Sequence, residues 1–142
     1  MENNKPKFTL IDHTADLGMI VHGDDLKNLF ETAAVSMLSI MLTGTPGGIV
    51  KPIKLSVEAQ DTEDLMVRWL GEILYLFEGE KVVASKIQIE SISPFSLKAT
   101  LYTVPFDTIR QKIVHEIKAV TYHEIEVTKK DNLWEARIIF DL

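Results

Sequence analysis

The chain contains no cysteine among its 142 residues. Without a thiol it cannot form a disulfide framework, use a thiolate nucleophile or bind zinc through sulfur. It also lacks any apolar run near the roughly 18 residues that a membrane-spanning helix needs. The segment from Met1 to Lys7 has no apolar stretch typical of a secretory signal. We therefore expect a protein of the reducing cytoplasm, with no membrane partner.

Positive charge is also scarce. Lysine and arginine together number 15 against 21 acidic residues, which gives a formal net charge of -6. The basic residues are scattered, with short doublets such as Lys129-Lys130 and no arginine-rich stripe. Because phosphate contacts dominate affinity for nucleic acids, this argues against broad nucleic-acid binding by the chain alone. If the protein acts on RNA, we expect it to do so indirectly, through a partner.

Several local catalytic signatures are absent. The glycine-rich loop at Thr43 to Gly48 is not followed by the Lys-Ser/Thr pair of a phosphate-binding P-loop, and Gly-x-Ser-x-Gly does not occur. The four histidines are dispersed, and we interpret each as structural before considering it a ligand: His13, His22, His115 and His123. No motif for nucleotide hydrolysis or serine catalysis is therefore present.

What is present is the composition of one globular domain. Hydrophobic residues make up 46% and charged residues 25% of the chain, which is ordinary for a folded protein. At this length one core is expected. We predict a disordered tail at residues 1–7 and a single domain over residues 8–142.

Hydrophobic periodicity predicts two helices and a majority of strands. Apolar residues recur at helical spacing from Leu26 to Met41 and again from Leu65 to Phe77, in a second helix that the acidic stretch Asp61–Asp64 opens and that Gly79 is expected to stop. Strand-like patterns cover the following segments: Phe8–Asp12, Met19–His22, Lys54–Ala59, Val82–Ile92, Phe95–Val104, Ile117–Thr128 and Leu133–Asp141. This order predicts an α+β fold, an antiparallel sheet with the two amphipathic helices packed on one face.

The last strand-like run has one apolar face. Trp134, Ala136, Ile138 and Phe140 alternate along it, so they are predicted to face the core. Asp141 falls on the other face. Its carboxylate should therefore meet solvent, a loop or an ion.

Acidic residues near both ends of the chain predict a possible metal site. Asp12 and Asp16 lie in one cluster, and Asp141 stands beside the last residue, Leu142. If folding joins the two clusters, their carboxylate oxygens suit Ca²⁺ or Mg²⁺. The alternative is that these carboxylates are simply solvated, as acidic residues at chain ends commonly are.

A second candidate surface lies between His115 and His123. On a continuous strand, Lys118 and Tyr122 would project to the same side. A lysine and a tyrosine so placed can contact a phosphate or a partner's carboxylate. An ordinary solvated strand face also explains the pattern, and from the sequence alone we prefer that interpretation.

Long segments of the chain resemble the archease family. The resemblance runs from about residue 8 to the last residue and keeps the family's motif order. The motifs that carry it are Asp12–Gly18 (Asp-His-Thr-Ala-Asp-Leu-Gly), Asp25–Ala34, Glu63–Tyr75, Glu116–His123 (Glu-Ile-Lys-Ala-Val-Thr-Tyr-His) and Ile138–Leu142 (Ile-Ile-Phe-Asp-Leu).

The resemblance implies a function that periodicity does not show. Archeases are accessory proteins of the RtcB-type RNA ligase of tRNA splicing, and they promote its guanylylation and multiple turnover. They are not the catalyst themselves. The family fold is α+β and is related to duplicated strand-helix-strand-strand modules. The expected partner is therefore the ligase, with RNA met through it, and the oligomeric state stays open.

The resemblance also implies site residues. By position, Asp16, Asp141 and Leu142 (through its backbone or terminal carboxylate) would hold a divalent cation, with Ca²⁺ the first candidate and Mg²⁺ or Mn²⁺ the others. Asp12 is a weaker candidate that would support the site. Lys118 and His123 belong to a motif of functional importance, and we expect them on a partner-facing surface.

Two other classes of function stay open. Asp16 and Asp141 could hold Mg²⁺ for a metal-dependent phosphoester hydrolase, with Lys118 stabilising charge. That reading lacks a paired-metal set of ligands and an evident general base. The other alternative is a chaperone-like module for RNA-modifying enzymes.

Overall fold

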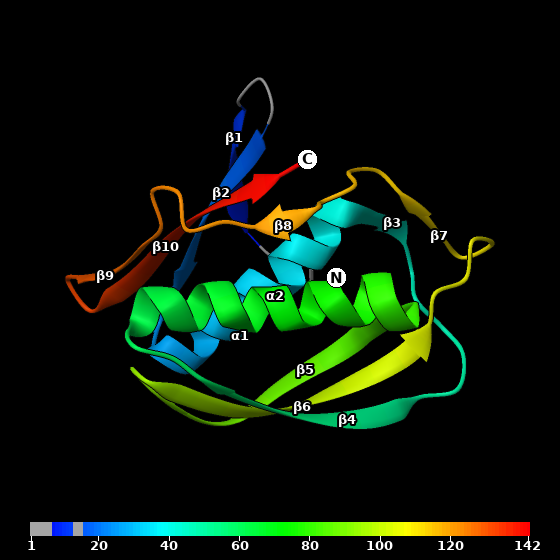
Figure 1. The fold of residues 1–142 in the computed structure, drawn as a ribbon, viewed down its shortest axis with the longest axis horizontal. Helices are drawn as coiled ribbons and strands as arrows, with labels where there is room; N and C mark the ends of the chain where they lie inside the picture. The colour runs from blue at the N-terminus through cyan, green and yellow to red at the C-terminus, as the bar shows by residue number, and fades with distance from the viewer. Residues whose placement is uncertain (1–6, 13–15) are drawn as a thin grey trace, which may run out of the picture.

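Two helices lie between two antiparallel sheets in this computed structural model, which describes residues 7–12 and 16–142 (Figure 1). Each larger sheet packs one of its faces on the helices. The predicted α+β class, with antiparallel sheets and two amphipathic helices, is confirmed. Residues 1–6 of the predicted disordered tail lie outside the described residues.

Both helices begin where the sequence places an aspartate. Asp25 caps α1 (Leu26–Met41) by accepting the Asn28 N–H at 2.7 Å. Asp61 caps α2 (Thr62–Glu80) by accepting the Asp64 N–H at 2.8 Å. A side-chain oxygen at this position satisfies an amide that has no partner within the helix. The indole N–H of Trp69, buried on α2, donates to the Phe30 carbonyl of α1 at 2.9 Å and ties the helices together.

The predicted stop of the second helix is wrong by two residues. The helix continues through Gly79 to Glu80. Lys81 then adopts a left-handed conformation with φ of 57°, and its N–H reaches the Leu76 and Phe77 carbonyls. The cap therefore uses a lysine in a conformation that glycine more commonly supplies.

The first sheet joins both ends of the chain. Its strand order is β1 (Phe8–Asp12), β2 (Asp16–Gly23), β10 (Leu133–Asp141) and β8 (Ala119–Val120). A further strand, β9 (Glu126–Lys130), forms a hairpin with β10. All these pairs are antiparallel.

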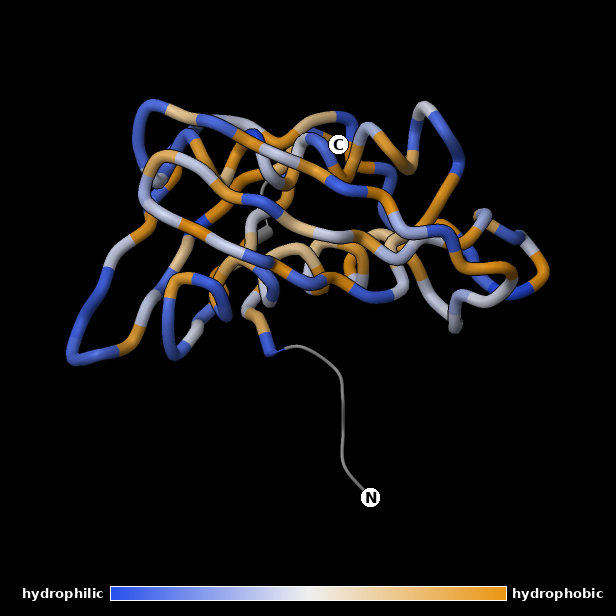
Figure 2. Tube along the Cα trace, turned by 90° about the horizontal axis from the view of Figure 1, so that it is seen from below, coloured by the Kyte–Doolittle hydropathy of each residue, from blue (hydrophilic) through white to orange (hydrophobic). Residues whose placement is uncertain are grey.

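The second sheet comes from the middle of the chain. Its order is β4 (Lys51–Glu58), β6 (Ser96–Pro105) and β5 (Val82–Ser93), again antiparallel. Polar and apolar positions alternate along the strands, so one face is solvated and the other lies on the helices (Figure 2). A two-stranded ribbon of β3 (Leu42–Gly44) and β7 (Gln111–Ile113), which the sequence analysis did not predict, completes the structure.

The predicted long strand from Ile117 to Thr128 is wrong. The chain forms only the two residues of β8, turns, and then starts β9. Both the hydroxyl and the N–H of Thr121 bond to the Ile139 carbonyl, at 2.9 and 3.0 Å. Glu124 then takes a left-handed φ of 51°. The Thr121 bonds extend the pairing of β8 with β10 by one residue, and a turn in which the Ile125 N–H donates to the Tyr122 carbonyl at 3.3 Å then takes the chain away from the sheet.

The predicted face of the last strand is confirmed. Ala136, Ile138 and Phe140 are fully buried and Trp134 is partly buried against the same core. Ile139, on the opposite face, is also buried, which alternation did not predict. Within the described part of the chain, no helix is long and apolar enough to cross a bilayer.

Candidate metal centre and the adjoining loop

The two acidic motifs meet at one end of the first sheet. Asp16 opens β2, Asp141 closes β10, and the two are direct cross-strand partners. Directly opposed residues in an antiparallel pair have side chains on the same face, with Cβ atoms about 4.5–5.5 Å apart. Asp141 is exposed and Asp16 partly buried. The structure thus brings together two of the carboxylates that the sequence analysis selected.

The other predicted metal ligands lie next to this pair. Leu142 follows Asp141 directly and is 38% exposed. The backbone of Asp12 pairs with Leu17, the neighbour of Asp16, and its side chain lies outside the described residues. His13, which the sequence places between the two aspartates, also lies outside them.

The donor chemistry of this corner fits a hard divalent cation. Two carboxylates directly opposite each other repel, and a bound cation removes that cost. Carboxylate and backbone oxygens are the ligands that Ca²⁺ and Mg²⁺ prefer. Among residues 7–12 and 16–142, however, no group of three or more His, Asp or Glu side chains is placed to hold an ion. Backbone oxygens, water or another molecule would have to complete the shell.

The motif around Lys118 is hydrogen-bonded to the same end of β10. The Lys118 N–H donates to the Asp141 carbonyl at 2.8 Å, and Ala119 pairs with Asp141 in the sheet. The Lys118 side chain is exposed. A cationic group therefore stands on the loop that adjoins the paired aspartates.

The second half of this motif packs elsewhere. The expectation that Lys118 and Tyr122 share one strand face is wrong, because the chain leaves the sheet after Val120. The Tyr122 hydroxyl instead donates to Asp64 Oδ1 on α2 at 2.6 Å. Asp64 also accepts the Arg68 Nε–H and the Gln60 N–H, both at 3.0 Å. A cavity of about 520 Å³ borders these groups.

This network shifts the ionisation of its members. The hydrogen bond from Tyr122, followed by that from the Gln60 N–H, lowers the pKa of Asp64. The bond to Asp64, followed by burial, raises the pKa of the Tyr122 phenol. The bond to Asp64 also raises the pKa of Arg68. No sequence pattern indicated this contact, because it joins residues 58 positions apart.

The histidines have separate surroundings. His123 sits on the turn after Tyr122, with Nε2 3.6 Å from Glu124 Oε1, and its side chain is 68% exposed. His22 Nε2 lies 2.8 Å from Glu135 Oε1, and His115 Nδ1 lies 3.0 Å from the Ile40 carbonyl. The last two contacts join neighbouring elements, in line with structural roles, whereas His123 is accessible to a partner.

Comparison with known proteins places this chain among close relatives. The protein archease of Methanosarcina acetivorans is 33% identical over 147 residues, covering 100% of both chains. The protein archease of Archaeoglobus fulgidus is 33% identical over 138 residues, covering 96% of this chain and 99% of that protein.

Two solved structures share the fold. The solution structure of Methanobacterium thermoautotrophicum protein 1598 superposes with a TM-score of 0.74 at 28% identity, covering 95% of this chain and 98% of that one. The crystal structure of an archease from Thermotoga maritima, described as a possible chaperone, gives 0.60 at 18% identity, covering 100% and 99%. The second likeness concerns the fold alone.

A family model supplies the remaining comparison. The model of the archease protein family matches residues 8–142, which includes every motif described above. Together with relatives above 30% identity over the whole chain, this match settles the assignment. The chain belongs to the archease family.

Proposed function

We propose that this protein is a non-catalytic accessory factor that activates an RtcB-type RNA ligase of tRNA splicing. It would promote guanylylation of the ligase and sustain its multiple turnover, and it would meet RNA through that partner in the cytoplasm. One observation supports this above the others: the family's acidic motifs, distant in sequence, converge as the Asp16–Asp141 pair beside the exposed Lys118 motif.

The paired aspartates and Leu142 are the residues that would hold a divalent cation. When bound, the ion would supply positive charge and vacant coordination positions at the protein surface. The chain's own groups would do the rest. Lys118 is exposed beside the pair and offers a positively charged contact to a partner. His123, on the turn that follows, adds an accessible imidazole.

Activation would work by differential binding. A factor shifts a partner's equilibrium only when it binds one state better than another. The protein would bind the ligase in the state whose nucleophile accepts the nucleotide and would then dissociate. Its net charge of -6 complements a basic RNA-binding enzyme and would speed their encounter.

The test of activation is ligation with limiting ligase and excess RNA. Without this protein, ligation should stall after about one cycle, because the ligase is not re-guanylylated efficiently. With it, ligation should continue and labelled guanylate on the ligase should reappear between cycles. Equal turnover in both conditions would refute the proposal.

Metal binding is tested separately by calorimetry. Ca²⁺, Mg²⁺ and Mn²⁺ are titrated into the metal-free protein and into the mixture with the ligase. Heat of binding that vanishes in Asp16→Asn would assign the ion to this corner. If neither the free protein nor the mixture binds any of the three ions, the metal part of the proposal fails while the activation assay remains informative.

A chaperone-like role is the second candidate, motivated by the description of the Thermotoga maritima relative as a possible chaperone. It predicts that the protein prevents aggregation of an unrelated heated client in the absence of any ligase. Activation of a fully folded ligase without such an effect would favour the accessory role. A phosphoester hydrolase is less well supported, because the described residues contain no group of three metal-binding side chains. If the native protein hydrolyses phosphoesters and Asp16→Ala abolishes that turnover, the hydrolase function would be supported instead.

A further inference from the structure

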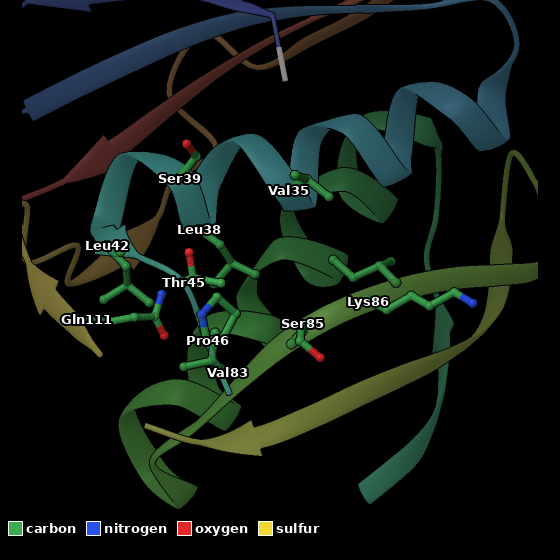
Figure 3. A pocket seen from close by; sticks show the side chains of 13 residues that line it. Val35, Leu38, Ser39, Leu42, Thr45, Pro46, Val83, Ser85, Lys86 and Gln111 are labelled. Carbon is green, nitrogen blue, oxygen red and sulfur yellow. The ribbon is translucent and has the colours of Figure 1, made fainter. Parts of the chain in front are cut away.

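A cavity of about 550 Å³ lies between helix α1, strand β5 and the β3–β7 ribbon (Figure 3). Leu38, Leu42 and Val83 border it and are buried, so its floor is aliphatic. None of the described residues that line it belongs to the candidate metal centre. Small-molecule sites in proteins enclose about 300–1,000 Å³ and combine a mainly apolar lining with a few polar groups. The size and lining of this cavity are those of such a site.

Strand β5 borders the cavity where its pairing with β6 is irregular. The register shifts between Ala84 and Lys86, and it shifts again between Ile89 and Ser91. The hydroxyl of Ser85, within the first shift, donates to the Tyr102 carbonyl at 3.0 Å. Because bulges disrupt the regular spacing of backbone groups, this edge does not offer the continuous ladder that an added strand needs. The cavity therefore suits a compact ligand.

Gln111 on β7 presents an unpaired carboxamide to the cavity. Its side chain is only 6% exposed, and Figure 3 shows the carboxamide turned toward the other lining side chains. Within residues 7–12 and 16–142 this carboxamide has no hydrogen-bond partner. A buried polar group without a partner is costly, so it indicates a ligand that supplies one. A carboxamide offers an acceptor and a donor side by side, which selects a ligand with the complementary pair.

The local backbone fixes the position of Gln111. It pairs with Gly44 in the β3–β7 ribbon, and its N–H donates to the Asp107 carbonyl at 2.9 Å. Gly44 has a φ of 82°, and a Cβ there would collide with the Arg110 carbonyl. Glycine therefore permits the close approach of β3 to β7. A group on a backbone fixed in this way loses little freedom when a ligand binds.

The interior of the cavity is uncharged among the described residues. Lys86 is the one ionisable residue of the lining, and its ammonium lies 5.4 Å from the centre of the Tyr102 ring. Tyr102 follows Leu101, which is buried against the helices, so alternation places Tyr102 on the solvated face of the sheet. Figure 3 shows the Lys86 side chain running away from the other lining side chains. A neutral ligand matches this interior.

From these features we propose that the cavity binds a neutral small molecule with an apolar ring body and an amide edge. A lactam presents its N–H and C=O side by side, so it can donate to and accept from the Gln111 carboxamide at the same time. The ring body packs on Leu38, Leu42 and Val83, where its apolar surface leaves water. The site goes beyond the ligase-activating function and does not depend on it.

Bicyclic lactams are the probes that test the site. Isocarbostyril, carbostyril and oxindole are titrated into the isotope-labelled, full-length protein, and their affinities are measured from amide chemical shifts. At least one of them should bind and should move the side-chain amide signals of Gln111. Its N-methyl derivative lacks the N–H and should bind at least about tenfold more weakly. Uridine carries the same edge on a polar ring with a sugar, and it should not bind.

Two variants separate recognition by Gln111 from unspecific apolar binding. Gln111→Met keeps the length of the side chain, so the lactam and its N-methyl derivative should bind with about equal affinity. Its melting temperature should stay equal or rise, because a buried carboxamide without a partner is removed. Val35→Trp should fill the mouth of the cavity and weaken lactam binding at least about tenfold. Val114→Trp is the control, since Val114 is 53% exposed, against 40% for Val35, and lies outside the lining.

Several outcomes would overturn the proposal. They are the absence of binding by all three lactams, an unchanged preference for the N–H form in Gln111→Met, and native affinity in Val35→Trp. Uridine that binds as tightly as the lactams would contradict the need for an apolar ring body. A homodimer that Val35→Trp dissociates would assign the cavity to a second copy of the chain and overturn the proposal as well.

Discussion

The two larger sheets share antiparallel pairing but are built from different parts of the chain. The first is assembled from segments at the two ends of the chain, with β2 beside β10. The second is built from the contiguous stretch between Lys51 and Pro105. The first sheet carries the paired aspartates and the Lys118 loop. The second sheet has an open edge and contains none of the site residues that were predicted from the sequence motifs. The paired aspartates therefore meet only when segments from the two ends of the chain have joined, whereas the second sheet is formed by one contiguous stretch of the chain.

The largest expected effect tests whether the two sheets form one cooperative unit. Phe140 is fully buried in the first sheet and belongs to the same core cluster as the helices. Phe140→Ala should lower the free energy of unfolding by about 3–5 kcal/mol through lost burial and a cavity. Denaturant unfolding followed by fluorescence measures the change.

The matched variant lies in the second sheet. Leu101 is fully buried on β6, and Leu101→Ala should lower the free energy of unfolding by about 2–5 kcal/mol. If the shared helices couple the sheets, each variant should accelerate amide exchange in both sheets. Exchange that rises only in the mutated sheet would show that the two sheets open independently.

The next prediction separates the two faces of β10. Asp141→Asn keeps the shape of the side chain and removes one of two opposed charges. It should weaken divalent-cation affinity at least about tenfold and abolish the stimulation of ligase turnover. Without metal its melting temperature should equal or slightly exceed that of the native protein, because like-charge repulsion is removed.

Thermal denaturation with and without Ca²⁺ measures both effects. The ion should raise the melting temperature of the native protein, because it binds only the folded state, and leave that of Asp141→Asn unchanged. Glu126→Gln on β9 removes one exposed carboxylate away from the pair and is the matched control. Loss of stability in Asp141→Asn as large as in Phe140→Ala would contradict the assignment of Asp141 to the solvated face.

Much of this fold was accessible from the sequence. Helical spacing located α1 and most of α2, and alternation identified Ala136, Ile138 and Phe140 as core. The failures occurred where local bonds override pattern. The Ile117–Thr128 segment alternates like a strand, yet a turn closed by the bond from the Ile125 N–H to the Tyr122 carbonyl interrupts it after Thr121. Ile139 is buried because the face of β10 opposite the core is also covered. Alternation along one strand does not show whether that face is covered.

The site was accessible in part. The composition of the acidic motifs suggested a shared oxygen site, and the register of β2 with β10 indeed places Asp16 opposite Asp141. The bond from Tyr122 to Asp64 was not accessible, because Asp64 follows a helix cap and reads as an ordinary first-turn acid. The position of β5 at the edge of its sheet could not be predicted either, because strand order is a property of the whole fold.

A smaller effect is expected when the terminal carboxylate of Leu142 is changed. A short flexible tag fused after Leu142 converts its terminal carboxylate into an amide while leaving Asp141 in place. Cation affinity measured by calorimetry should fall by about threefold, which is less than for Asp141→Asn, because one oxygen donor loses its charge. The same tag at the N-terminus is the control. Unchanged affinity would mean that the ion uses only the side chains and a backbone carbonyl.

The smallest effect concerns the anchor of the Lys118 loop. Tyr122→Phe removes the donor to Asp64, so the melting temperature should fall by a few degrees near neutral pH. The depressed pKa of Asp64 means that its share of the stabilisation exists above its ordinary value of 3.8 and is lost as the pH falls. The raised pKa of Tyr122 means that the phenol contributes below its ordinary value of 10.0, with the loss occurring as the pH rises through the folded-state value.

The stability difference between the native protein and Tyr122→Phe should therefore form a plateau across neutral pH and shrink at both extremes. Denaturant unfolding at a series of pH values measures it. Arg68→Gln is the second variant to compare, because it removes the other side chain bound to Asp64. The stability difference between the native protein and Arg68→Gln should shrink only on the acid side. A difference close to zero at every pH would mean that the phenol ring, which Tyr122→Phe retains, rather than the hydroxyl, holds the loop. In that case the position of Lys118 beside the paired aspartates would depend on apolar packing and on its backbone bond to Asp141.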